Sequence, residues 1–91
     1  MPADDLAAWI DELRRRLGAG ELRSLPPIDL GNGLTLRDME LAAWVMLADV
    51  DRYAAMPPEL RQRPVIAARR RLLADNLRRL RERLDSRPGR G

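Results

Sequence analysis

The chain contains no cysteine, no histidine and no phenylalanine, and aromatic residues make up only 3% of its 91 residues. Without cysteine it has no disulfide, no zinc–thiolate site and no thiol redox chemistry. Without histidine it lacks the commonest general base and the commonest metal ligand. Its acidic residues do not recur at the spacing of a known calcium loop. We therefore expect no enzyme, no cofactor, no metal site and no small-molecule substrate.

Lysine is also missing, so all 17 basic residues are arginine. One explanation is the codon usage of a GC-rich genome, which would place the chain in a bacterium or a phage. The other is selection for bidentate contacts to phosphate or carboxylate, which arginine makes better than lysine. Composition alone leaves both explanations open.

The charge is unevenly distributed along the chain. Residues 1–59 carry six arginines and eleven acids, a net charge of −5, whereas residues 60–91 carry eleven arginines and three acids, a net charge of +8. Such asymmetry often marks a basic arm that binds nucleic acid. It is equally expected where two halves of opposite charge attract each other, within one fold or across a dimer.

The length is that of one small domain. We expect a single helical domain at residues 1–85, followed by a flexible basic tail at residues 86–91, where Pro88 and Gly89 discourage regular structure. The chain has no apolar run of about 20 residues, so no membrane span is expected. It does not open with a charged and then apolar leader, so we expect a cytoplasmic location.

The spacing of apolar residues predicts an all-α fold, a bundle of three helices at residues 5–17, 35–54 and 64–85. Thr35 has the chemistry of an N-cap for the central helix, with Asp38 three residues later as in a capping box. Pro57 and Pro58 end that helix. Pro64 suits the first position of the last helix, where its missing N–H costs nothing.

The connection between the first two helices is an extended segment rich in proline and glycine, residues 21–34. We expect an ordered loop whose leucines cover one end of the core, because an isolated two-stranded ribbon is only marginally stable. The alternative is a very small β-hairpin, since apolar residues alternate on both sides of Gly31-Asn32-Gly33.

The central helix, residues 35–54, is apolar on two opposite sides. The predictions of the fold and of an interface both depend on this feature. Met39, Ala43 and Met46 fall on one stripe, and Leu41 and Trp44 fall roughly opposite. A helix that is apolar all round is normally covered on both sides. The covers are either the two flanking helices, or one flanking helix and a second molecule.

This pattern gives a set of six candidate interface residues on the central and last helices. Tryptophan is enriched at binding hot spots, so Trp44 is the expected anchor, although a place in the core is the alternative. Leu80 and Leu84 either pack on the loop at residues 25–34 or meet a helix of the partner. The full candidate set is Trp44, Leu41, Val45, Leu77, Leu80 and Leu84.

Nucleic-acid binding is the competing hypothesis. The basic last helix would act mainly through phosphates, because no aromatic residue for base stacking follows Tyr53. On a helical wheel its arginines are spread around the helix, whereas a phosphate-binding surface is usually one concentrated basic face. The candidate residues are Arg70, Arg71, Arg78, Arg79, Arg81 and Arg83.

The sequence thus favours a non-catalytic helical interaction module, a self-associating adaptor or small regulator whose partner is a protein or a second copy. An arginine-rich DNA- or RNA-binding protein is the alternative.

Overall fold

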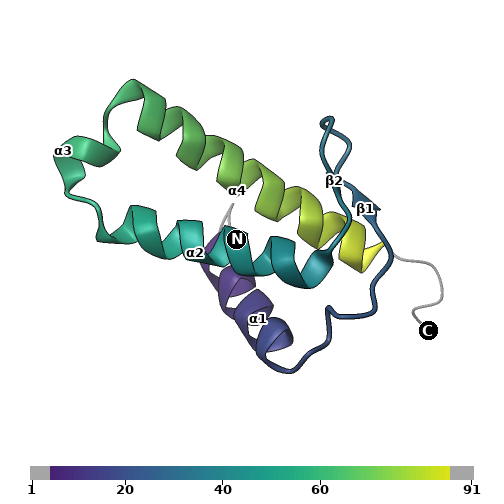
Figure 1. The fold of residues 1–91 in the computed structure, drawn as a ribbon. Coiled ribbons are helices and arrows are strands. Elements are labelled where there is room, and N and C mark those ends of the chain that lie inside the picture. Colours follow the sequence, from purple (N-terminus) through teal and green to yellow (C-terminus); the bar gives the residue numbers. More distant parts are fainter. Residues whose placement is uncertain (1–4, 87–91) are drawn as a thin grey trace.

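The computed structural model describes residues 5–86, which form a mainly helical fold with one small β-hairpin (Figure 1). The expectation of a mainly helical chain is confirmed. Within the described residues the structure adds a short fourth helix and a hairpin to the three helices expected. The elements in order are α1 (Leu6–Gly18), β1 (Ile28–Asp29), β2 (Thr35–Leu36), α2 (Met39–Ala55), α3 (Pro58–Arg61) and α4 (Pro64–Asp85).

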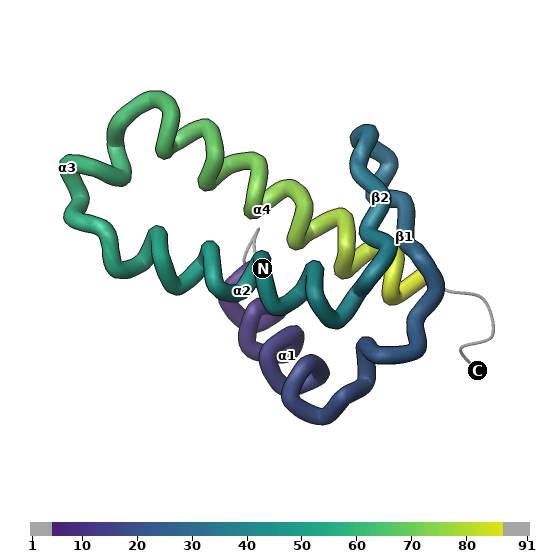
Figure 2. Tube along the Cα trace, viewed as in Figure 1, coloured from purple at the N-terminus to yellow at the C-terminus, as the bar shows by residue number. Residues whose placement is uncertain are grey.

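The helices α2 and α4 run antiparallel and are joined through α3, and they approach each other more closely toward the hairpin (Figure 2). Helix α1 packs against both of them. Its buried Trp9 donates a hydrogen bond from the indole Nε1 to the backbone oxygen of Leu77, at 2.9 Å. This bond satisfies the one polar atom of the tryptophan inside the core and fixes α1 against α4.

The segment between α1 and α2 was expected to be an ordered loop, and the structure instead has the alternative, a small β-hairpin. Ile28 pairs with Leu36, and Asp29 pairs with Thr35, in an antiparallel register. The turn uses Gly31 and Gly33 at φ +82° and +91°, a backbone region that favours glycine. The ribbon is two residues long on each side, so contacts with α4 must supply most of its stability.

Two side-chain hydrogen bonds attach the hairpin to α4. Asn32 Nδ2 donates to Asn76 Oδ1 at 2.7 Å, and Arg79 donates to the backbone oxygen of Leu30 at 3.2 Å. The Leu30 side chain is fully buried. The hairpin therefore covers the C-terminal half of α4 and closes that end of the core.

The predicted start of the central helix is wrong. Helix α2 begins at Met39, and its N-cap is Asp38, whose carboxylate accepts a hydrogen bond from the Leu41 backbone N–H at 3.0 Å. Thr35 cannot be the cap because it lies in β2, paired with Asp29. The C-terminal boundary, one residue before Met56 and the two prolines, is close to the prediction.

Helix α4 has the bounds predicted for it within one residue, with Pro64 at its first position and Ser86 as the C-cap. The rest of the predicted basic tail, residues 87–91, lies outside the described residues. No helix in the range 5–86 combines the length and the apolar character that a membrane crossing requires.

Candidate functional site

The outer face of α2 carries an exposed apolar stripe, which we call the α2 outer face and define as Leu41, Trp44, Val45 and Ala48. These positions are spaced i, i+3, i+4 and i+7, so their side chains point in one direction. Trp44 is 62% exposed, Leu41 57% and Val45 45%. The exposed tryptophan lies between two exposed aliphatic side chains. The three side chains together form one apolar patch, unlike an isolated apolar residue at the surface.

The opposite face of α2 is buried within the chain. Met39, Ala43, Met46 and Leu47 are all at most 8% exposed and belong to the common core. The remainder of residues 5–86 therefore covers one side of α2 only. Of the two places the sequence allowed for Trp44, core or surface, the structure has it at the surface.

Two shallow hollows lie along the α2 outer face, one on each side of Trp44. The larger, of about 490 Å³, extends toward the start of α2 and is lined by Leu17, Asp38, Glu40, Leu41 and Trp44. The smaller, of about 400 Å³, extends along α1. Leu17 and Trp44 line both hollows. The indole of Trp44 therefore separates the two hollows, and the C-terminal end of α1 lies beside it.

Two ion pairs form a polar rim around this patch. Arg14 on α1 reaches Asp51 on α2 with N···O distances of 2.7 and 3.3 Å, a bidentate contact. Arg23 reaches Glu40 at 2.8 Å. The hydrogen bond that Arg14 donates to Asp51 raises the pKa of Arg14, and the one that Arg23 donates to Glu40 raises the pKa of Arg23. Both guanidinium groups remain charged at any physiological pH.

An apolar centre inside a polar rim is the usual anatomy of a protein–protein interface. The rim pairs are solvent-exposed, so each adds little to stability. Their more important effect is to neutralise the border of the patch.

The other half of the predicted interface set is not at the surface. Leu77, Leu80 and Leu84 are 1%, 0% and 3% exposed and belong to the same core as Trp9 and Leu30. The sequence left open whether Leu80 and Leu84 meet the 25–34 segment or a partner. The intrachain alternative holds, because α1 and the hairpin together cover this part of α4. The three leucines therefore share no exposed surface with Trp44.

The arginines predicted for nucleic-acid binding do not form one face. Arg79 bonds Asp75 at 2.8 Å as well as the Leu30 backbone oxygen, so it has a structural role. Arg81 lies 4.0 Å from Asp85. Arg70 and Arg71 are exposed near the other end of the helix. Arg78 and Arg83 are also exposed, but they lie in its C-terminal half.

Two exposed apolar residues on α4 were not among the residues predicted to form an interface. Val65 is 66% exposed and Leu72 is 57% exposed. They lie seven residues apart and so share a side of the helix, turned by about 100° from the buried leucine stripe. The sequence shows this spacing, but the three arginines between the two residues made that part of the helix look polar.

No group of three or more acidic side chains that could hold a metal ion occurs among residues 5–86. Comparisons of the chain with protein-family models, with curated proteins and with solved structures gave no match.

Proposed function

We propose that the chain is a non-catalytic helical interaction module that associates with a second copy of itself through the α2 outer face, and acts as an adaptor or regulator. The observation that carries the proposal is the 62% exposure of Trp44 at the centre of an apolar stripe. Burying such a side chain in a partner's hollow is the kind of contact that dominates binding energy at interfaces.

A second copy fits this face because the rim is close to electrically neutral. In a two-fold contact one patch meets an identical patch. Arg14 and Arg23 balance Asp51 and Glu40, which leaves only the single charge of Asp38 beside the larger hollow, so two copies can approach without strong repulsion. A partner of high charge would gain little from such a border.

Sedimentation velocity over a range of protein concentrations tests self-association directly. Trp44→Ala is expected to weaken the dimer by more than about 1 kcal/mol, because it removes the central anchor. A dimer constant unchanged by this substitution would reject the α2 outer face as the interface.

Leucine offers a matched pair of variants. Leu41 on α2 and Leu72 on α4 are both 57% exposed. Leu41→Ala should weaken association, whereas Leu72→Ala should leave it unchanged within about 0.5 kcal/mol, since it lies on another helix. The reverse result would move the interface to the exposed stripe of α4.

A second candidate function is binding to DNA or RNA through phosphates, and it rests on the corner where α3 meets α4. Residues 58–74 contain five arginines and one acid, Glu59. None of the five forms an ion pair with another residue in the range 5–86. The five are Arg61, Arg63, Arg69, Arg70 and Arg71.

Fluorescence anisotropy with labelled DNA and RNA at several salt concentrations tests this candidate. Replacing Arg69, Arg70 and Arg71 with glutamine should flatten the salt dependence, since each phosphate contact contributes about 0.9 to the logarithmic slope on duplex DNA. The absence of any binding at low salt would rule the candidate out.

A further inference from the structure

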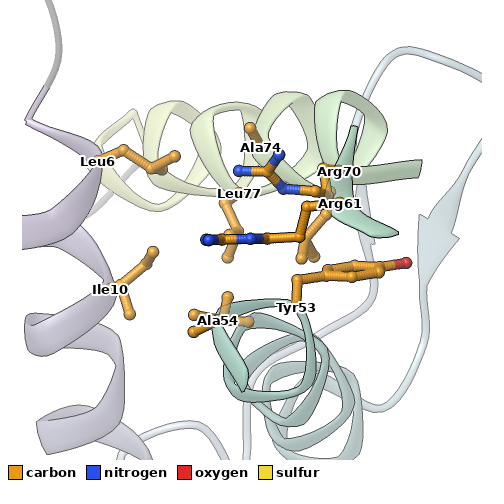
Figure 3. A pocket seen from close by; sticks show the side chains of 10 residues that line it. Leu6, Ile10, Tyr53, Ala54, Arg61, Arg70, Ala74 and Leu77 are labelled. Atoms are coloured by element: carbon orange, nitrogen blue, oxygen red, sulfur yellow. The ribbon is translucent and has the colours of Figure 1, made fainter. Parts of the chain in front are cut away.

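A separate pocket of about 270 Å³ opens between all four helices of the described chain (Figure 3). It lies on the side of the molecule where α2 and α4 diverge toward α3. Its walls are mostly apolar, with Leu6 and Ile10 from α1 at one side, Tyr53 from α2 at the other, and Leu73 and Leu77 from α4. It shares no lining residue with the hollows of the α2 outer face.

Two guanidinium groups extend into this apolar space. Figure 3 shows the side chains of Arg61 and Arg70 reaching across the pocket in the same direction, toward α1. Arg61 comes from α3, whose turn is closed by a hydrogen bond from the Arg61 backbone N–H to the Pro57 oxygen at 3.1 Å. Arg70 comes from the second turn of α4. Two separate elements thus bring two positive charges to one opening.

The described part of the pocket supplies no negative charge to balance them, since no acidic residue among positions 5–86 lines it. Within residues 5–86 neither Arg61 nor Arg70 forms an ion pair, whereas Arg14, Arg23 and Arg79 each have a carboxylate partner. Two like charges beside an apolar surface repel each other, and an anion between them would turn this repulsion into attraction.

We propose that this pocket binds a small aliphatic carboxylate, with its carboxylate between Arg61 and Arg70 and its hydrocarbon chain against the apolar walls. A carboxylate matches the planar fork of a guanidinium and can accept two parallel hydrogen bonds from it. An apolar pocket with a few convergent polar groups is the usual form of a small-molecule site. The ligand is a bound effector and undergoes no reaction, so the expectation of no substrate is unaffected.

The volume limits the ligand's size. A water molecule occupies about 30 Å³ of liquid, and a methylene group occupies a similar volume, so the pocket holds on the order of nine non-hydrogen atoms. This matches a carboxylic acid of medium chain length, such as octanoic acid. A long-chain fatty acid would extend beyond the pocket.

Titration of the full chain with sodium octanoate, followed by calorimetry and by backbone amide NMR, tests the proposal. The largest amide shifts are expected at pocket residues such as Ala54 and Ala74. Two probes separate the parts of the ligand: octan-1-ol keeps the chain without the charge, and acetate keeps the charge without the chain. Each should bind at least about tenfold more weakly than octanoate, because each loses one of the two contributions.

Two double variants separate the local charge from the overall charge. Arg61→Gln with Arg70→Gln should weaken octanoate binding about tenfold or more and leave octan-1-ol binding unchanged. Arg69→Gln with Arg71→Gln removes the same net charge at exposed positions that do not line the pocket, and should change octanoate binding less than about twofold. Ala54→Leu, which fills the pocket with a larger side chain, should abolish binding without unfolding the chain.

Three results would overturn the proposal. The first is an absence of any octanoate-dependent amide shift at the pocket. The second is equal affinity for octanoate and octan-1-ol, which would mean that the arginines do not recognise the head group. The third is an equal loss of affinity in the two double variants, which would reduce the effect to overall charge. Because Trp44 lies on another face, Trp44→Ala should bind octanoate normally whether or not the chain self-associates.

Discussion

The two tryptophans of this chain lie in opposite environments. Trp9 is 4% exposed and bonds the Leu77 backbone oxygen, whereas Trp44 is 62% exposed, with hollows on both sides. Both stood at helical spacing among apolar neighbours in the sequence. Their difference arises from tertiary packing. Trp9 lies on the side of α1 that packs into the core, whereas Trp44 lies on the side of α2 that no other element of residues 5–86 covers.

Trp9→Phe should destabilise the fold. It removes a buried hydrogen bond and part of a large core side chain, so a loss of about 1–3 kcal/mol in the free energy of unfolding is expected. Trp44→Phe should cost less than about 0.5 kcal/mol in the monomer, because that ring is largely in water. Urea denaturation followed by circular dichroism, at a concentration where the chain is monomeric, makes the comparison. Equal losses in the two variants would contradict the difference in burial.

Single residues were the hardest feature to predict from sequence. Leu77, Leu80 and Leu84 have the spacing of a helix–helix seam, and that spacing does not say which segment covers it. The cover is α1 and the hairpin, and the hairpin depends on side-chain bonds between residues more than forty positions apart. Leu41 and Val45 were predicted as interface residues because both sides of their helix are apolar; both are exposed, and their role in an interface stays a prediction.

At the scale of the elements, helix α4 was predicted almost to the residue and α2 was not. Pro64 can occupy the first turn of a helix but not its interior, so it marks a boundary that no tertiary contact changes. At residues 35–38, by contrast, Thr35 was predicted as the N-cap and Asp38 as its capping-box partner, whereas Asp38 is itself the cap. Thr35 pairs with Asp29 across the hairpin, and this pairing depends on a strand that local sequence signals only weakly.

The cap can be tested by substitution. Asp38→Ala should cost about 1 kcal/mol in the free energy of unfolding, because the N–H of Leu41 loses its acceptor at 3.0 Å. Thr35→Ala, at the position first expected to be the cap, should cost clearly less, since Thr35 is exposed in a two-residue strand. Thermal unfolding of both variants decides between the two positions. A larger loss at Thr35 would restore the earlier assignment.

At the scale of the whole molecule, the proposals assign three different regions to three different contacts. The α2 outer face would meet a second copy, the pocket between the helices would hold a small carboxylate, and the α3–α4 corner is the candidate for phosphates. The last two share Arg61 and Arg70, so a carboxylate and a nucleic acid would compete there. The first is separate, because its rim is close to neutral and its residues line no part of the pocket.

Self-association predicts a stability that depends on protein concentration. If the dimer forms from folded chains only, the unfolding midpoint should rise as the concentration increases, by mass action. In Trp44→Ala this rise should disappear or become much smaller, while the midpoint at high dilution stays the same. Differential scanning calorimetry at several concentrations measures both. A midpoint independent of concentration in the unaltered chain would show that no dimer forms under those conditions.

The separation of the two indoles also gives the molecule two natural optical reporters. Emission from a ring sealed in the core is blue-shifted and is poorly quenched by iodide, whereas emission from a ring in water is red-shifted and readily quenched. Trp9 therefore monitors whether the chain is folded, and Trp44 monitors whether its open face is occupied. Loss of iodide quenching without any change in the blue component would record the arrival of a partner on α2, with no label attached.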